Sequence, residues 1–403
     1  MFDPEPLRSR FPALARTHRG ASVAYFDGPG GTQVPESVIG AIAGVLEAGV
    51  SNLGGPFAAS QLAEETMIET RRAVADLFGA ADPDSLVFGQ NMTSLTFSVS
   101  RALARTWRPG DRIVVTSLDH DANVAPWRMA AADAGVAVDI ARFDSSTYQL
   151  PVEAVEEVLT DRTRLVAVTH ASNALGSIPD VAAIVEAAHR VGALVYVDAV
   201  HYAPHGVVSV GDLDADFLVA SAYKFFGPHT GCLYGRRELL EELDAYKVRP
   251  APASGPEKWE TGTQSFESLA GVTAAVDYLA GLGEGEDRRA RLIDGYRRVG
   301  EYLDGLTAMF LDGLGEHLTL HGIAGTGART PTFAITVEGV SPRRVAQRLA
   351  EAGLYVGDGH FYAIEPMTQL GLLDQGGAVR IGFVHTTTRG EVDRLLEALA
   401  AFG

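Results

Sequence analysis

The chain has 403 residues, of which 46% are hydrophobic and 21% charged, as in an ordinary folded protein with room for two domains. A net charge of −18 excludes the basic surface that binding to nucleic acid requires. A single cysteine, Cys232, excludes an internal disulfide framework and a metal site built from several cysteines, and we predict no metal. The sequence shows neither a secretory signal nor an apolar run of membrane-spanning length, so we expect a cytoplasmic protein without a membrane partner.

Short runs rich in β-branched residues alternate with helical patterns through the middle of the chain. These runs lie at residues 85–89, 112–117, 136–143, 164–172, 193–201, 216–223 and 231–239. Strand-like runs that alternate with helices predict an α/β fold with a mostly parallel sheet that is covered on both faces. In such sheets ligands bind beyond the carboxyl ends of the strands, so we expect the functional residues just after these runs.

The pattern changes near residue 270. A long helical stretch over residues 270–314 precedes strand-like runs at 330–339 and 378–387, and a last helix begins near Arg389. This order predicts a smaller α+β domain packed on the first. We assign residues 23–270 to a large cofactor-binding domain, and residues 1–22 and 271–403 to the small domain.

Three side chains at the ends of predicted strands carry the strongest chemical signal. Asp198 ends VYVD, Lys224 follows FLVASAY, and His120 lies in SLDHDANVAPW. Pyridoxal phosphate requires a lysine for a Schiff base, an acid for its pyridine nitrogen and usually a flat group over its ring. Each residue also has an ordinary alternative, namely a capping aspartate, a surface lysine and a histidine that bonds its own loop. The combination favours a pyridoxal-phosphate site.

Six segments follow one another along almost the whole chain in the order of a known family. They are YFDGPGGTQVP (25–35), HDANVAPW (120–127), HASNALGSIPD (170–180), VDAVH (197–201), SAYKFFGP (221–228) and VRIGFVHTTTRGEVDRL (379–395). Together they resemble fold-type I pyridoxal-phosphate enzymes of the class V aminotransferase family, in the cysteine-desulfurase-like branch. The resemblance implies a large domain with a mostly parallel seven-stranded sheet and a small α+β domain.

The resemblance also implies the residues that hold the cofactor. Lys224 would form the Schiff base and carry protons, Asp198 would pair with the pyridinium nitrogen, and His120 would stack on the ring and take part in catalysis. The other cofactor contacts would come from His201, Ser221, Asn91, Met92, Thr93 and Thr263. Thr263 resembles a threonine that reaches the phosphate of the other subunit, which implies a homodimer with shared active sites.

The substrate would be held by residues from three further segments. Arg380 would bind the α-carboxylate of an amino acid, because a planar guanidinium suits bidentate pairing. Asn173 would lie near the substrate amino or carboxylate group, and His360 would lie beside the substrate in the loop over residues 353–366. Four aromatic residues are candidates to line the pocket: Phe57, Trp259, Phe361 and Tyr362.

One loop departs from the family pattern. Cysteine desulfurases carry a mobile cysteine in a loop of the type Arg-x-Gly-x-x-Cys, and the corresponding loop here is GLYVGDGHFYAIEP (353–366). If Gly359 aligns with the glycine of that pattern, Tyr362 takes the place of the cysteine. A phenol cannot become a persulfide, and Cys232 is better explained as a small core residue. We therefore predict that no persulfide forms.

These residues predict an enzyme that acts on a small amino acid bound to pyridoxal phosphate as a Schiff base. We favour β-elimination, as in a C–S lyase, which requires only Lys224 as the base. Transamination and epimerisation are alternatives, and epimerisation needs an acid on the opposite face, such as Tyr362, His360 or His120. Two alternatives of other classes are a cofactor-free Schiff-base aldolase and a non-catalytic protein that binds the cofactor and an amino acid.

Overall fold

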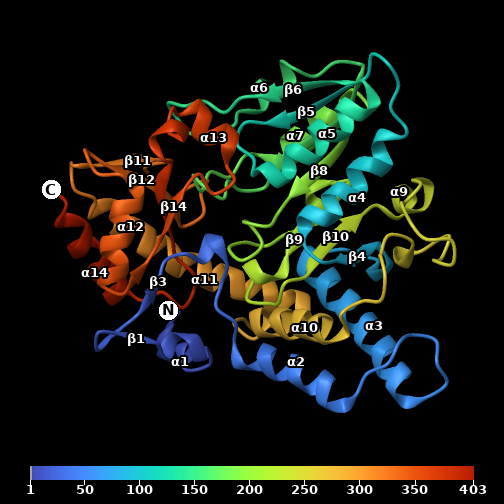
Figure 1. Cartoon of the computed structure of the whole chain (residues 1–403), viewed down its shortest axis with the longest axis horizontal. Coiled ribbons are helices and arrows are strands. Elements are labelled where there is room, and N and C mark those ends of the chain that lie inside the picture. Colours follow the sequence, from blue (N-terminus) through green and yellow to red (C-terminus); the bar gives the residue numbers. More distant parts are fainter. Residues whose placement is uncertain (1) are drawn as a thin grey trace.

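The computed structural model describes residues 2–403 and places a large sheet beside a smaller one (Figure 1). The large sheet has seven strands in the order β4-β10-β9-β8-β7-β5-β6. Only β10 runs antiparallel to its neighbours, so the predicted mostly parallel seven-stranded sheet is confirmed. Its strands are β4 (Leu86–Gly89), β5 (Arg112–Thr116), β6 (Ala137–Ala141), β7 (Thr163–Thr169), β8 (Leu194–Asp198), β9 (Phe217–Ser221) and β10 (Gly231–Gly235).

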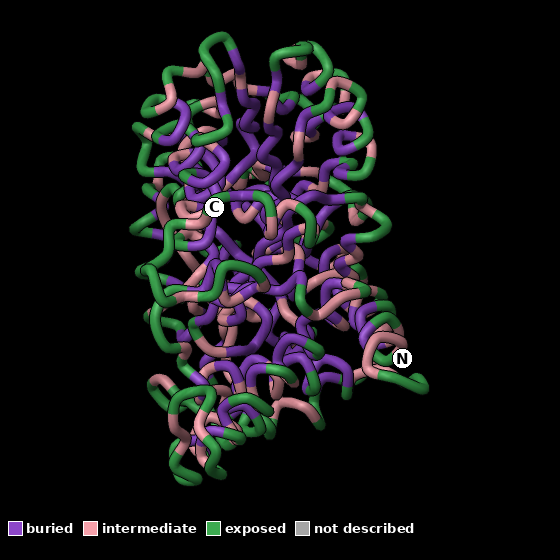
Figure 2. The backbone as a smooth tube through the Cα atoms, turned by 90° about the vertical axis from the view of Figure 1, so that its right-hand side faces the viewer, coloured by how far each residue is buried: buried purple, intermediate pink, exposed green. Residues whose placement is uncertain are grey.

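Helices cover both faces of this sheet. They are α2 (Glu36–Ala48), α3 (Ala58–Phe78), α4 (Met92–Ala104), α5 (Ala125–Ala134), α6 (Val152–Glu156), α7 (Val181–Arg190), α8 (Val210–Leu213), α9 (Arg237–Glu242) and α10 (Phe266–Ala280). Alternate residues of a strand point to opposite faces. In β8, Tyr196 therefore packs with α4 and α5, whereas Val195 and Val197 pack with α3, α7 and α10. Figure 2 shows the resulting buried interior with exposed loops around it.

The smaller sheet holds four antiparallel strands in the order β11-β12-β15-β14. Its strands are β11 (Leu318–His321), β12 (Thr332–Val337), β14 (Gly357–Gly359) and β15 (Ala378–Gly382). The helices that follow α10 are α11 (Arg288–Asp312), α12 (Pro342–Glu351), α13 (Ile364–Gln369) and α14 (Arg389–Ala400). A separate core of apolar side chains from α11, α12, α14 and this sheet supports the second unit.

The helical stretch predicted over residues 270–314 is wrong in one respect, because it is divided into α10 and α11. The connection over residues 281–287 contains Gly281, Gly283 and Gly285, and glycine disfavours a continuous helix. Asp287 then caps α11 by accepting a hydrogen bond from Ala290 N at 2.8 Å. The predicted domain boundary at residue 270 falls within α10, which packs against α2 and α3, and the domain assignment stays a prediction.

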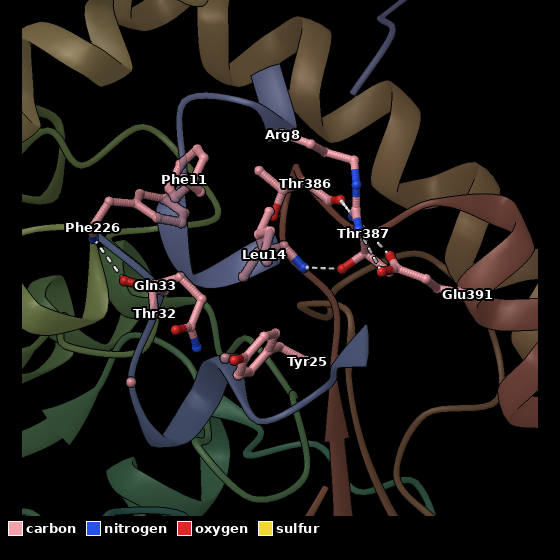
Figure 3. A pocket seen from close by; sticks show the side chains of 13 residues that line it. Arg8, Phe11, Leu14, Tyr25, Thr32, Gln33, Phe226, Thr386, Thr387 and Glu391 are labelled. Carbon is pink, nitrogen blue, oxygen red and sulfur yellow. Dashed lines mark hydrogen bonds and ion pairs between the residues drawn. The ribbon is translucent and has the colours of Figure 1, made fainter. Parts of the chain in front are cut away.

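The N-terminal segment crosses from the small unit to the large one. It contains α1 (Glu5–Arg8), β1 (Thr17–His18), β2 (Ala21–Ser22) and β3 (Ala24–Tyr25), and β3 pairs with β13 (Leu354–Tyr355). Arg8 donates to both carboxylate oxygens of Glu391 in α14, at 3.0 and 2.8 Å. This ion pair (Figure 3) lines a cavity whose volume is about 20 Å³, which has room for about one water.

None of the helices in residues 2–403 combines the length and the apolar character needed to cross a membrane.

Candidate active site

A cavity of about 950 Å³ lies at the carboxyl ends of β5, β7, β8 and β9, the edge at which the sequence places the functional residues. Residues of the β14–α13 segment and Arg380 of β15 contribute to its wall from the small unit. Most of the predicted site residues line this cavity: Asn91, Met92, Thr93, His120, Asn173, Asp198, His201, Ser221, Lys224, Tyr362 and Arg380.

Lys224 sits in a short turn directly after β9. Its Nζ donates a hydrogen bond to Pro29 O at the start of the chain and lies 4.8 Å from the centre of the Tyr223 ring. Burial and the nearby Arg380 lower the pKa of Lys224 to about 7, against the opposing effect of the carboxylates Asp27 and Asp198. A substantial fraction of this amine is therefore neutral and nucleophilic near neutral pH.

Asp198 is the last residue of β8 and is buried. Its Oδ1 accepts a hydrogen bond from Val200 N at 2.9 Å, which fixes the carboxyl group at the strand end. Burial raises the pKa of Asp198 to about 6, whereas the Val200 amide and the Lys224 charge lower it. A protonated ring nitrogen placed beside this carboxylate would favour its charged form.

His120 begins the loop after β5 and presents a neutral ring to the cavity. Burial, with Lys224 and Arg380 nearby, lowers the pKa of His120 to about 4. Its Nδ1 accepts a hydrogen bond from Ala122 N at 3.0 Å, which assigns the ring proton to Nε2. The Tyr362 ring stacks on it with centroids 5.5 Å apart and planes inclined by 25°.

The N-terminus of α4 supplies amide and hydroxyl donors. Met92 N donates to Ser221 Oγ at 2.9 Å, and Asn91 caps the helix by accepting from Ser94 N at 2.9 Å. The Thr93 amide takes part in neither of these bonds. It lies in the first turn of a 13-residue helix, where the helix dipole favours an anion. At Gly231 in β10, a Cβ would lie 2.5 Å from the backbone carbon of Asn91, so this close approach requires glycine.

Arg380 is buried and has a free donor. Its Nη1 donates to Asn173 O and its Nη2 to Asp27 Oδ1, both at 3.2 Å, while the Phe361 ring lies 4.4 Å from Cζ. Within residues 2–403, the buried Arg380 Nε and Asn173 Oδ1 have no hydrogen-bond partner. Buried polar atoms are usually paired, so these two atoms indicate a place for a polar ligand.

Three predicted residues have different surroundings. His201 Nε2 faces the hydroxyl groups of Thr330 and Thr332 at 3.1 and 3.0 Å, although the residue also lines the cavity. His360 and Thr263 are exposed, and neither lines the cavity. A contribution of Thr263 to a cofactor site thus requires a second copy of the chain, and it stays a prediction.

Two of the aromatic residues predicted to line the pocket do not. Phe57 is 51% exposed at the start of α3, and Trp259 is buried with its Nε1 donating to Leu240 O at 3.0 Å. The prediction is wrong for Trp259, which is a core residue, whereas Phe57 only lies outside the cavity of its own chain. An aromatic residue in a loop is equally suited to a surface or to a core. Phe361 and Tyr362 do line the cavity.

The turn over residues 27–32 also contributes to the site, although the sequence alone did not predict it. Besides Asp27 and Pro29, this turn contains Thr32, whose N donates to Tyr223 O at 3.0 Å. Thr32 Oγ1 accepts from Phe226 N at 2.8 Å (Figure 3). The turn is therefore attached on both sides of Lys224. Its residues lie in the first segment that resembles the family, but that segment alone does not predict the contact of Asp27 with Arg380.

Asp119, directly before His120, was also missed. It is buried, accepts a hydrogen bond from Asn123 Nδ2 at 2.7 Å and bonds the hydroxyl group of Thr116. Asn123 Oδ1 in turn accepts from Trp127 Nε1 at 3.0 Å. Burial raises the pKa of Asp119 to about 8. This network fixes the loop that carries His120.

The fold and the site define a class of protein: a fold-type I enzyme that uses pyridoxal phosphate. The family model for class-V aminotransferases matches residues 24–395, and the chain belongs to that family. It is 32% identical to an uncharacterized protein of Mycobacterium tuberculosis over the full length of both chains. It is 31% identical to a cysteine desulfurase of Pectobacterium carotovorum, covering 98% of this chain and 97% of that one. A crystal structure of a cysteine desulfurase from Escherichia coli superposes with a TM-score of 0.86 at 27% identity, covering 100% of this chain and 98% of the other.

The residues present fit the cofactor of this family. Lys224 provides a partly neutral amine, and Asp198 a buried carboxylate. The N-terminus of α4 and Ser221 offer donors to a phosphate. Because Gly231 has no side chain, the backbone of Asn91 at this helix terminus can pack closely against it. Family membership leaves the alternative of a cofactor-free aldolase without support.

Proposed function

We propose that this protein is a pyridoxal-phosphate enzyme that eliminates the Cβ substituent of a small α-amino acid, as a C–S lyase does. The observation that carries the proposal is the aromatic side chain of Tyr362 in the cavity wall, which takes the place of the family cysteine if Gly359 aligns with the glycine of the Arg-x-Gly-x-x-Cys pattern. The only cysteine of the chain, Cys232, is fully buried in β10, and its burial raises the thiol pKa. Elimination, like transamination and epimerisation, needs no second nucleophile, and the resemblance to desulfurases, which also break the Cβ–S bond, favours elimination among the three.

Four residues of the cavity have a role in this reaction. Bound pyridoxal phosphate supplies an electron sink for the carbon next to the substrate nitrogen. Lys224 anchors the cofactor, and its neutral amine accepts the proton from the substrate Cα. Asp198 holds a proton on the pyridine nitrogen, and the neutral ring of His120 covers the cofactor. Arg380 binds the substrate carboxylate with donors that include the unpaired Nε.

The net reaction is balanced without an oxidant. A cysteine S-conjugate and one water give pyruvate, ammonia and the free thiol, as the Cβ–S bond breaks and the Cα proton is lost. Lys224 takes up that proton and can return it to the departing sulfur. No group of the protein changes its oxidation state.

The test is to incubate the holoprotein with L-cysteine, with cysteine S-conjugates and with pairs of amino donors and keto acids. The proposal expects pyruvate, ammonia and thiol in equal amounts from a conjugate. Keto acid formed without ammonia would identify an aminotransferase instead, and loss of optical activity without other products would identify an epimerase. Binding of every amino acid without any product would identify a non-catalytic protein.

We also propose a homodimer in which Thr263 of one copy serves the cavity of the other. The exposure of Thr263 and its absence from the cavity of its own chain support this arrangement. Mixed dimers of Lys224→Ala and Thr263→Ala chains would contain one intact cavity. They should regain activity that neither variant has alone, and a failure to do so would contradict the shared site.

A further inference from the structure

Two consecutive aromatic residues, Phe361 and Tyr362, form a left-handed turn at the wall of the cavity. Their φ angles are 55° and 57°, a region that costs a non-glycine residue roughly 1–2 kcal/mol. Residues held in this region persist only where their surroundings fix them, and they are concentrated at functional sites. The contacts that fix this turn therefore indicate its purpose.

Both carbonyl groups of the turn are held by loops at the edge of the large sheet. Phe361 O accepts a hydrogen bond from Asn173 Nδ2 at 2.9 Å, and Tyr362 O accepts one from Asp121 N at 2.7 Å. Asn173 follows β7 and Asp121 follows β5. The turn, which belongs to the small unit in sequence, is thus attached to the two loops that carry predicted site residues.

The attachment places the Phe361 ring against Arg380. The ring centre lies 4.4 Å from Arg380 Cζ, which is the distance of a close cation–π contact. Arg380 pairs with Gly357 across the antiparallel strands β14 and β15. A Cβ at Gly357 would lie 3.3 Å from Phe361 Cε1 and 3.0 Å from Asp27 Oδ1. The absent side chain of Gly357 leaves room for Phe361 and Asp27, two of the three groups that contact the guanidinium.

The same glycine falls at the arginine position of the Arg-x-Gly-x-x-Cys pattern. This chain therefore departs from that pattern at both ends, with Gly357 at the first position and Tyr362 at the last. The two departures belong together in space, because the ring next to Tyr362 occupies the space beside Gly357. The guanidinium is held by Asn173 O, by Asp27 and by the Phe361 face, and its Nε is left without a partner.

We propose that Phe361 is a positioning residue that sets the plane of the Arg380 guanidinium for the α-carboxylate of the substrate. The inference rests on the proposed role of Arg380 as the carboxylate anchor and not on the reaction that follows. Phe361 contributes a flat face that a leucine of similar bulk cannot supply, and a tyrosine can. Loss of that face frees the guanidinium to turn and weakens the binding of carboxylates specifically.

The experiment titrates the wild-type holoprotein and its Phe361→Leu and Phe361→Tyr variants with L-alanine and with ethylamine, which lacks the carboxylate. Binding is followed by the visible absorbance of the cofactor. We expect Phe361→Leu to lower the affinity for L-alanine about tenfold, with ethylamine unchanged and with wild-type behaviour restored in Phe361→Tyr. Tyr246→Leu is the matched control, because Tyr246 also contacts arginine side chains but does not line the cavity.

Three results would overturn the inference. In one, Phe361→Leu keeps the wild-type preference for L-alanine over ethylamine. In another, both Phe361 variants lose it equally. In the third, a crystal structure of Phe361→Leu shows the guanidinium in its original plane, and this measurement does not depend on whether L-alanine binds. If the wild-type protein itself shows no preference, the proposed role of Arg380 fails, and the inference falls with it.

Discussion

The lysine segment (residues 221–228) and the aromatic turn (residues 357–363) contribute to the same cavity in different ways. The lysine segment directly follows the fully buried strand β9. Lys224 is held between the turn over residues 27–32 and the Tyr223 ring. The aromatic turn has two strained residues and a Tyr362 side chain that is 66% exposed. The first region supplies the lysine that we propose as the anchor of the cofactor, which every reaction of the cofactor requires. The second contains Tyr362, on which the proposal of a reaction without a persulfide rests.

The largest effect is expected in the lysine segment. Replacing Lys224 with alanine removes both the anchor of the cofactor and the base, so turnover should fall by about 10³-fold or more. Lys247→Ala is the control, because this lysine is exposed and donates only to Ala251 O in its own loop. Comparable turnover in the Lys224 and Lys247 variants would contradict the assignment of Lys224.

A smaller but still large effect is expected at Asp198. The Asp198→Asn variant keeps the shape and the hydrogen bond from Val200 N but loses the charge that we propose to hold a proton on the cofactor nitrogen. Turnover should fall by about 10²-fold. The visible spectrum of the bound cofactor should shift as well, and an unchanged spectrum would show that Asp198 is not its partner.

At Arg380, on the side of the aromatic turn, the effect should appear mainly in KM. Arg380→Lys keeps a positive charge and loses the planar fork, which should raise KM for an amino acid about tenfold to a hundredfold, or roughly 1.5–3 kcal/mol. Binding of ethylamine serves as the internal control. A loss confined to kcat would contradict a role in holding the carboxylate.

The pH dependence of cofactor binding tests whether the pKa of Lys224 is lowered. The lowered pKa of about 7 means that the amine loses its proton well below the ordinary range of lysine. The rate at which the apoprotein takes up pyridoxal phosphate should thus fall as pH drops through 7 and level off above it. A rate that continues to rise toward pH ~10 would show an ordinary lysine.

The smallest effect is expected from Tyr362→Phe. This change keeps the ring that stacks on His120 and removes only the hydroxyl group. Elimination needs no acid from this side, so turnover should change by less than about tenfold, whereas loss of a required acid costs about 10²-fold or more. A loss of that size would favour the alternative in which Tyr362 protonates the substrate, as in an epimerase.

The same two regions show how far the sequence can predict this molecule. The seven strands and the placement of Asp198 and Lys224 at their ends follow from buried β-branched runs, whose pattern is local and strong. The contact between Phe361 and Arg380 depends on the register of β14 with β15 and on a left-handed turn that aromatic residues rarely adopt. Neither leaves a local signal.

Contacts between residues that are distant in the sequence are equally difficult to predict from it. Asp27 reaches Arg380 through a pairing between the beginning and the end of the chain, and a composition or a periodicity does not encode such a pairing. The break between α10 and α11, by contrast, could have been predicted from the three glycines of that connection.

The central claim is that this enzyme eliminates a Cβ substituent without a persulfide. The most direct measurement incubates the holoprotein with L-cysteine and, separately, with a cysteine S-conjugate. It quantifies pyruvate, ammonia and the released sulfide or thiol, and it determines by mass spectrometry whether Cys232 carries extra sulfur after incubation with L-cysteine. The account predicts the three products in equal amounts and an unmodified Cys232. Alanine together with a persulfide on Cys232 after incubation with L-cysteine, or keto acid formed without ammonia, would contradict it.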